Sequence, residues 1–385
     1  MEPNDMDRKY GSFVTSALDV VKLKFVSSLD EIECDETIGF APEFVHQQFG
    51  DQEKVIGYKD LSADDIISKI HDHLIEPNQL VKDVAEFRAK LDDQGKFKPF
   101  GKMITQMDFV SFYDGEVKQI QLYKMGSGEY DEKERAYIGR AQSLALWYID
   151  AANYTTCNDD PRYVYYLAFE ATKSADGTPK YKFAGYATLY RFYRHPSMTR
   201  MSLAHILLAP QYRRKGNGVK FLNSLYNDIT NEENIYDITF ETPSDALQLA
   251  RDFADCVNCA ALHEFSPEKL AKGFSKEIKN SARENLKLYG PQAKRVGEIL
   301  RLHHAGNDEK MRLTLKNDMM RRIEKLISDV RRGMNDNENT PEGDARRDVE
   351  AEQRKKLVEQ QYEDTLEAYN KVLDRLREYI PLYNK

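Results

Sequence analysis

The chain has 385 residues, of which 31% are charged and 41% hydrophobic, and its formal net charge is −8 at pH 7. This length allows two or three domains with a substantial core. The first twenty residues hold no apolar stretch of the kind found in secretory signals, and apolar runs such as 164–169 are too short to span a bilayer. The composition therefore predicts a soluble intracellular protein and disfavours a membrane protein.

Four cysteines occur, at Cys34, Cys157, Cys256 and Cys259. So few cysteines in a chain of this length do not indicate a disulfide framework, and they favour a reducing compartment. Cys256 and Cys259 have the spacing of half a zinc site, but the sequence offers no second pair of ligands. We interpret the two as core residues near a helix and expect no metal.

Acidic residues dominate between Asp30 and Asp65, where eleven Asp and Glu face only Lys54 and Lys59. Such a surface attracts a basic partner and repels nucleic acid, although an ordinary solvated face has the same composition. A capping serine, Ser62, precedes acids and predicts a helix over 62–80. We assign residues 1–102 to a small α/β domain whose acidic face is a possible substrate or partner surface.

Residues 103–262 form the next predicted domain, with the order helix, strand, turn, strand, strand, loop, helix, strand, helix. Strands over 163–170 and 183–193 are rich in β-formers, and the loop 174–179 between them contains Asp-Gly and Pro, as a hairpin connection does. A strand over 201–209, a helix from Val219, a strand over 235–240 and a helix opened by Pro243 and Ser244 follow.

The loop Arg213–Gly218 is basic and contains two glycines. Glycine lets the backbone turn close to a ligand, so that successive N–H groups point at an anion, and the following helix adds its positive N-terminal end. The loop predicts a pyrophosphate site, although a solvated surface turn has the same residues. Glu241 ends the next strand and is a candidate general base. It could instead be an acid that complements the dipole of the next helix.

The rest of the chain is predicted to be helical and densely charged. We divide it into a helical domain over 263–333, a flexible linker over 334–343 without apolar residues, and a charged helix over 344–385. The last segment carries a heptad seam, the apolar and threonine positions Val358, Tyr362, Thr365, Tyr369, Val372, Leu376 and Tyr379. The seam could dimerise, bind another protein or fold back on a helix around 319–327, and we favour folding back.

Several segments carry a family resemblance. Ile206–Pro210 followed by Arg213-x-x-Gly216-x-Gly218 resembles motif A of the GNAT acetyltransferase superfamily. Longer matches resemble the type B histone acetyltransferase catalytic subunits, namely 146–150, 237–244, 251–253, 265–274 and 294–302. The resemblance is clear over 97–302, weaker before it and lost in the tail. It implies an α+β fold, with a GNAT-type mixed, splayed sheet flanked by helices, an N-terminal α/β domain and a C-terminal helical region.

The resemblance also implies the co-substrate acetyl-CoA, no metal, and a set of site residues. The pantetheine arm and thioester would contact the backbone of Ile206, Leu207 and Leu208. The pyrophosphate would lie on Arg213, Arg214, Lys215, Gly216, Asn217, Gly218 and Val219. The general base falls on Glu241 and an assisting carboxylate on Asp150, which is shorter than the usual glutamate. Thr242 replaces a carboxylate, and Ala246 replaces a cofactor-contacting serine for which Ser244 is our candidate.

The implied reaction is acetylation of lysines near the N-terminus of free, newly synthesised histone four, in the nucleus and cytoplasm, with a WD-repeat histone-binding subunit. Direct binding to DNA or to a membrane is not expected. One alternative is a histone escort that retains the acetyl-CoA site, and another is a GNAT enzyme for a different amine, such as a polyamine. Glu241 together with Gly216 and Gly218 disfavours the first alternative, and the long matches disfavour the second.

Overall fold

The computed structural model describes residues 21–24, 39–42, 85, 89, 97–126, 130–149, 152, 160–174, 176–332 and 343–380. Several predictions fall outside these ranges: most of the acidic region 30–65, the helix over 62–80, the linker up to residue 342, Cys34, Cys157 and Asp150. None of the helices within these ranges is long and apolar enough to cross a membrane.

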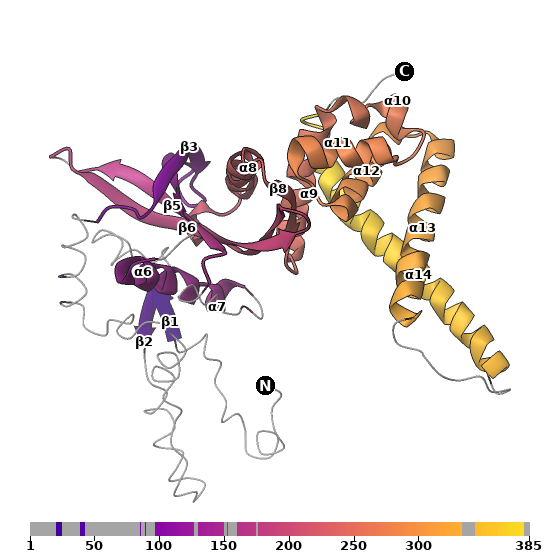
Figure 1. Cartoon of the computed structure of the whole chain (residues 1–385), viewed down its shortest axis with the longest axis horizontal. Coiled ribbons are helices and arrows are strands. Elements are labelled where there is room, and N and C mark those ends of the chain that lie inside the picture. Colours follow the sequence, from indigo (N-terminus) through magenta and orange to yellow (C-terminus); the bar gives the residue numbers. More distant parts are fainter. Residues whose placement is uncertain are drawn as a thin grey trace, which may run out of the picture. The chain divides into compact units, whose positions relative to one another are not determined.

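The largest element of the fold is a six-stranded sheet (Figure 1). Its strands pair in the order β3 (Lys102–Val110), β4 (Val117–Met125), β5 (Tyr163–Lys173), β6 (Pro179–Arg194), β7 (Met198–Leu208) and β8 (Ile235–Phe240). The pairs from β3 to β6 are antiparallel. Helix α8 (Asn217–Thr230) joins β7 to β8, and parallel neighbours need such a crossover. The sheet is therefore mixed, and the predicted α+β class is confirmed.

Two strands of this sheet, β3 and β4, were not predicted from the sequence, which we interpreted as opening this domain with a helix. The register of β4 was readable, because buried Ile120 and Leu122 alternate with Gln119 and Gln121 as a half-buried strand requires. Between the strands lies Gly115 with a φ of 71°, a turn conformation that glycine adopts without strain. A further pair, β1 (Val21–Lys24) and β2 (Gly39–Pro42), is antiparallel.

The chain divides into two compact units: Met1–Arg191 with Leu203–Asn217, and Phe192–Ser202 with Gly218–Lys385. In the first unit, α6 (Glu132–Ser143) and α7 (Ala145–Tyr148) share a core with β5. A reciprocal capping box between Asp131 and Glu134 begins α6. The predicted five-segment domain division stays a prediction.

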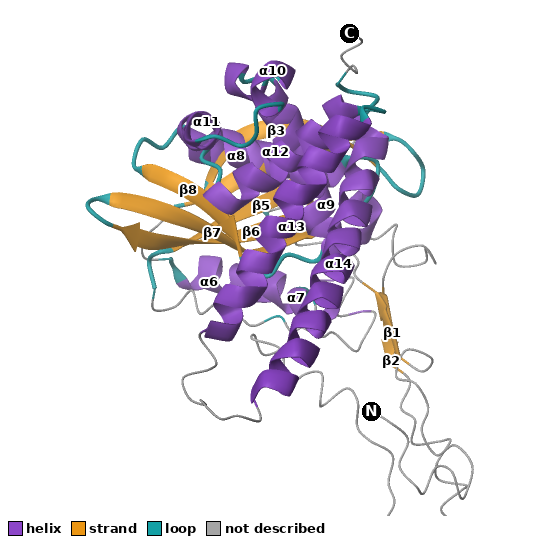
Figure 2. Ribbon diagram, turned by 90° about the vertical axis from the view of Figure 1, so that its right-hand side faces the viewer, coloured by secondary structure: helices purple, strands orange, loops and turns teal. Residues whose placement is uncertain are grey.

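The second unit has a helical core built from α9 (Asp245–Ala260), α10 (Pro267–Leu270), α11 (Lys276–Leu286), α12 (Gly290–Ala305), α13 (Glu309–Arg332) and α14 (Gly343–Leu376). Figure 2 shows α13 and α14 running side by side. Most of the predicted seam is buried there, with Tyr369, Val372 and Leu376 each at 0% exposure, in one cluster with Met319 and Ile323 of α13. Tyr379, its last predicted member, lies beyond the end of α14 and is 65% exposed. Folding back, the option favoured from the sequence, is what the structure shows.

Cys256 and Cys259 lie in this same helical core. Both side chains are 0% exposed and both thiols are free. Burial raises the pKa of each thiol well above its ordinary value. The interpretation of the pair as core residues is confirmed.

Candidate active site

The end of β7 is held tightly against β6 within the first unit. A Cβ added at Gly185 would stand 2.3 Å from the carbonyl oxygen of Leu207, so only glycine allows this approach. The N–H of Ala209 donates to the carbonyl of Ala184 at 2.9 Å. Leu207 and Leu208 are buried and Ile206 is half-buried. The predicted pantetheine-contacting backbone therefore lies at the C-terminal end of an interior strand and packs closely against β6.

The loop after β7 has an unusual backbone. Arg214, Lys215 and Gly216 follow one another with φ angles of 64°, 52° and 78°. A side-chain-bearing residue in the left-handed region costs roughly 1–2 kcal/mol, so the loop stores strain at Arg214 and Lys215. Of the two glycines, only Gly216 needs its conformational freedom. A Cβ at Gly216 or Gly218 would meet no described atom within 4 Å beyond the adjoining chain, so there is room for a ligand beside the loop.

Asn217 anchors this loop with a fully buried side chain. Its Nδ2 donates to the carbonyls of Val110 and Tyr212, at 2.7 and 3.2 Å, and its Oδ1 accepts from the N–H of Val110 at 3.0 Å. Its own N–H donates to the carbonyl of Arg214 at 3.0 Å. The side chain of Asn217 thus holds the loop on β3, and the neighbouring residues are better placed to contact a ligand. Helix α8 begins here, and the first turn of a helix presents N–H groups that intrahelical bonds leave unsatisfied.

The three cations of the loop differ in their surroundings. Nε of Arg213 donates to the carbonyl of Leu208 at 2.7 Å, and its guanidinium lies 4.1 Å from the ring centroid of Tyr148. Burial lowers the pKa of Arg213 from its ordinary value. The side chains of Arg214 and Lys215 are exposed. Arg213 therefore ties the loop to the end of β7, while Arg214 and Lys215 supply charge facing solvent.

Glu241 directly follows β8 in the second unit, and its side chain is exposed. The hydroxyl of Ser202, itself 2% exposed, donates to Oε1 of Glu241 at 2.9 Å. The next residue, Thr242, has a φ of 35°, which is rare for a β-branched residue and is a kind of strain found at functional positions. The carboxylate of Glu241 is therefore oriented by one buried donor and remains open to a substrate.

Ser202 is a site residue that the sequence did not predict. Its only signal was a hydroxyl within the otherwise apolar start of the run 201–204. Nearby in the same unit, Arg200 donates to both carboxylate oxygens of Asp237, at 2.6 and 2.7 Å, which joins β7 to β8. This pair, whose aspartate is buried and whose arginine is half-buried, links β7, which carries Ser202, to β8, which Glu241 follows.

The remaining predicted residues have simpler surroundings. Ser244 caps α9, and its hydroxyl accepts from the N–H of Leu247 at 3.4 Å. Val219 lies in the first turn of α8. The structure brings residues 206–208 and 213–217 together in the first unit, and it places Gly218, Val219, Glu241 and Ser244 in the second. Within the described ranges, no group of three or more His, Cys, Asp or Glu side chains is arranged to hold a metal.

Two protein-family models match parts of the chain. A model described as the N-terminus of histone acetyl transferase HAT1 matches residues 13–64 and 61–150. A second, described as the C-terminal part of the histone acetyltransferase type B catalytic subunit, matches residues 251–302.

Three relatives, each named histone acetyltransferase type B catalytic subunit, align over nearly the whole chain. The human protein is 27% identical over 96% of this chain and 95% of its own length. The rat protein has the same identity and coverage, and the mouse protein is 26% identical over 96% of both chains. The observed mixed sheet with flanking helices agrees with a GNAT-type acetyltransferase fold. The chain is thus similar over nearly its whole length to the type B histone acetyltransferase catalytic subunits, and these findings support histone acetyltransferase activity.

Proposed function

We propose that the protein transfers the acetyl group of acetyl-CoA to N-terminal tail lysines of free, newly synthesised histone four, with Glu241 as the general base. The observation that carries this proposal is the exposed carboxylate of Glu241, which follows the end of β8 and accepts a hydrogen bond from the buried hydroxyl of Ser202 on β7. A lysine amine has a pKa of about 10.4 and is almost entirely protonated at neutral pH, so a base must remove its proton before it can attack.

Acetyl-CoA would supply the activated thioester. The strained loop at Arg214–Gly216 and the start of α8 suit its pyrophosphate, because open space and exposed cations adjoin a helix N-terminus. We assign contacts with the pantetheine arm to the backbone of Ile206–Leu208 and pyrophosphate contacts to Arg213–Val219. Ser244 is proposed as a further cofactor contact. No metal is assigned a role in the reaction.

The chain's own residues divide the work of proton transfer. Glu241 accepts the proton of the lysine ammonium, directly or through a water molecule. Ser202 keeps Oε1 of Glu241 in one orientation, as a positioning residue. Asp150 is proposed to assist. A backbone N–H of the Ile206–Leu208 segment is proposed to stabilise the oxyanion that forms when the amine attacks.

The proposal extends to partners and location. A histone substrate accords with the names of the relatives. We propose in addition a WD-repeat histone-binding subunit, no direct contact with DNA, and action in both the nucleus and the cytoplasm. The five-segment domain division belongs to the same proposal, with the acidic region 30–65 as the surface that attracts a Lys/Arg-rich tail.

Glu241→Gln tests the base assignment. We expect kcat on a histone four tail peptide to fall by about 10²–10⁴-fold across pH 7 to 9, because the amide cannot accept the proton. Ser202→Ala should lower kcat by a smaller factor and leave KM for the peptide unchanged. Glu233→Gln, an exposed acid just before β8, is the matched control. A Glu241→Gln enzyme within a few-fold of wild type would show that another group is the base.

A substrate panel separates the proposed function from its alternatives. Free histones, nucleosomes and polyamines are each offered with acetyl-CoA, and acetyl transfer is followed on each. Preference for free histone four supports the proposal. Transfer to polyamines alone would identify an enzyme for another amine, and histone binding without transfer would identify an escort.

A further inference from the structure

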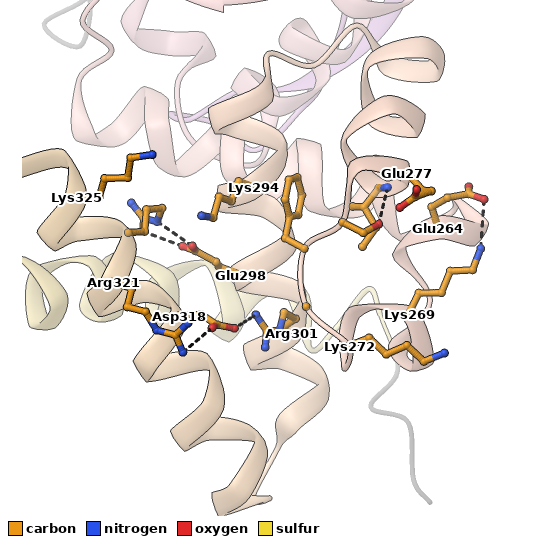
Figure 3. A pocket seen from close by; sticks show the side chains of 15 residues that line it. Glu264, Lys269, Lys272, Glu277, Lys294, Glu298, Arg301, Asp318, Arg321 and Lys325 are labelled. Carbon is orange, nitrogen blue, oxygen red and sulfur yellow. Dashed lines mark hydrogen bonds and ion pairs between the residues drawn. The ribbon is translucent and has the colours of Figure 1, made fainter. Parts of the chain in front are cut away.

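The helical part of the second unit contains a pocket of about 740 Å³. Its walls come from α11, α12 and α13, from the segment between α10 and α11, and from Lys269 of α10 and Glu264 just before α10 (Figure 3). The proposed catalytic and cofactor-binding residues are absent from its lining. Its chemistry therefore has to be explained by something other than acetyl transfer.

The lining of this pocket carries an excess of positive charge. Seven Lys or Arg side chains line it, against four Asp or Glu side chains, which leaves a net charge of about +3 at neutral pH. The chain as a whole has a net charge of −8. The pocket therefore differs in sign from the molecule that contains it, and a local field of this kind attracts an anionic ligand.

Two of the acids are already used to hold the helices together. Glu298 is 2% exposed, and it accepts from Nε and Nη2 of Arg322, each at 2.8 Å, and from the hydroxyl of Tyr369 at 2.7 Å. Asp318 accepts from Arg301 at 3.0 Å. These bonds pair Glu298 and Asp318 with cations and fix the walls that α12 and α13 supply. They do not neutralise the remaining lysines.

Three lysines of the lining have no such partner: within the described part of the chain, Lys272, Lys294 and Lys325 form no ion pair. Figure 3 shows them well apart, with Lys325 at one end, Lys272 at the other and Lys294 between them. Phe274 lines the same pocket and packs partly on the helical core. The cations are thus spread along the pocket, beside an aromatic surface, and do not converge on one point.

This arrangement selects among anionic ligands. A single phosphate group could meet only part of a row of cations that are spread in this way, whereas an extended chain with several carboxylates could meet each of them. The histone tail is Lys/Arg-rich and would be repelled. Nucleic acid is disfavoured because a nucleic-acid binder normally has a basic overall balance, whereas the whole chain is acidic. A polypeptide offers both carboxylates and a side chain suited to Phe274.

We propose that this pocket docks an acidic segment of a partner protein, with carboxylates facing Lys272, Lys294 and Lys325 and an apolar side chain against Phe274. Charge complementarity of this kind sets which partner binds and how fast it associates. The basic histone tail cannot occupy this positively charged pocket, so the pocket would bind a protein other than the substrate. It does not depend on the proposed identity of the catalytic base.

The test uses the full-length protein and a fluorescein-labelled peptide of Asp and Glu with one central Leu, followed by fluorescence anisotropy. The variant Lys272→Glu/Lys294→Glu/Lys325→Glu should weaken binding by about tenfold or more, because three attractive contacts become repulsive. The matched control Lys133→Glu/Lys310→Glu/Lys355→Glu makes the same change in net charge at exposed lysines elsewhere. It should change binding by less than about twofold. Replacing Leu by Ser in the peptide should also weaken binding.

Each other outcome overturns the proposal. Equal losses in the two triple variants would mean that only overall charge matters, and no binding to wild type would mean that the pocket has no acidic ligand. A DNA duplex that binds as tightly and is lost in the same variant would assign the pocket to nucleic acid. A Leu-to-Ser peptide that binds unchanged would remove the role of Phe274. Acetylation of the histone four tail peptide should be unchanged in both triple variants, so this result is separable from the proposed catalytic function.

Discussion

The loop Arg213–Gly218 and the helical pocket are both positively charged, but they are stabilised in different ways. The loop depends on backbone conformation, with three successive left-handed residues, and on one buried amide, Asn217. The pocket depends on ion pairs between helices in which one partner is buried, such as Glu298 with the half-buried Arg322. A backbone-built site is sensitive to the loss of one glycine or one amide. A site built from ion pairs is sensitive to the loss of one charge.

Removing the buried charge of Glu298 should have the largest effect on stability. In Glu298→Ala, Arg322 and the hydroxyl of Tyr369 lose their common acceptor, and breaking a buried pair in this way costs roughly 3–5 kcal/mol. Chemical denaturation of the variant measures the loss. Glu324→Ala, at an exposed position on the neighbouring helix α13, should stay within about 0.5 kcal/mol of wild type. Equal stability of the two variants would contradict the view that this pair holds the helices.

Asn217→Ala is the corresponding test in the loop. It leaves two carbonyls and one N–H without their side-chain partner, and a buried polar group left unpaired costs about 1–3 kcal/mol. We expect a loss of about 2–4 kcal/mol and a weaker acetyl-CoA complex by calorimetry. Asn227→Ala, exposed on the same helix, is the control. Unchanged acetyl-CoA affinity in a folded Asn217→Ala protein would separate the anchor from the cofactor site.

The pH dependence of stability should reveal the titration of a buried carboxyl group, Asp255, in the second unit. Asp255 is 1% exposed, and burial raises its pKa to about 6. Because the folded pKa lies above the unfolded value of about 3.9, its contribution to stability is complete below pH 4 and is lost as pH rises through 6.

We therefore expect Asp255→Asn to gain stability relative to wild type by up to about 3 kcal/mol between pH 4 and 8. Denaturation at several pH values in this range gives the difference. Asp374→Asn, an exposed aspartate, should show a flat difference over the same range. A flat difference for Asp255→Asn would mean that Arg251, 3.5 Å away, keeps the carboxylate charged at low pH.

The smallest predicted effect compares the two glycines of the loop. Gly216→Ala places a side chain at a φ of 78° and should cost about 1–2 kcal/mol. Gly218→Ala lies in the first turn of α8 without a positive φ and should be neutral or stabilising by up to about 1 kcal/mol. Thermal denaturation of the pair measures the difference. Equal costs would show that the loop conformation is not limited to glycine at position 216.

The same contrast explains which features were predictable from sequence. Local sequence patterns predicted the strands over 163–170 and 235–240 and the glycine-containing loop 213–218. Such patterns are readable because strand composition and glycine placement act within a few residues. The heptad seam was visible for the same reason, whereas its partner α13 was one of three options. Ser202 with Glu241 and Glu298 with Tyr369 were not predictable, because each pair joins residues 39 and 71 positions apart. The hairpin of β3 and β4 was missed although its alternation was present.

Because the side chain of Asn217 binds the backbone of Val110, an amide on β3 reports whether the loop 213–218 is ordered. The amide proton of Val110 is held by the Asn217 side chain, so it can exchange with deuterated solvent only when the loop anchor or the β3 end opens. A ligand that stabilises the loop with the Asn217–Val110 hydrogen bond intact raises the free energy of opening, and the exchange at Val110 slows accordingly. The exchange rate at Val110 therefore reports ligand binding without observing the ligand.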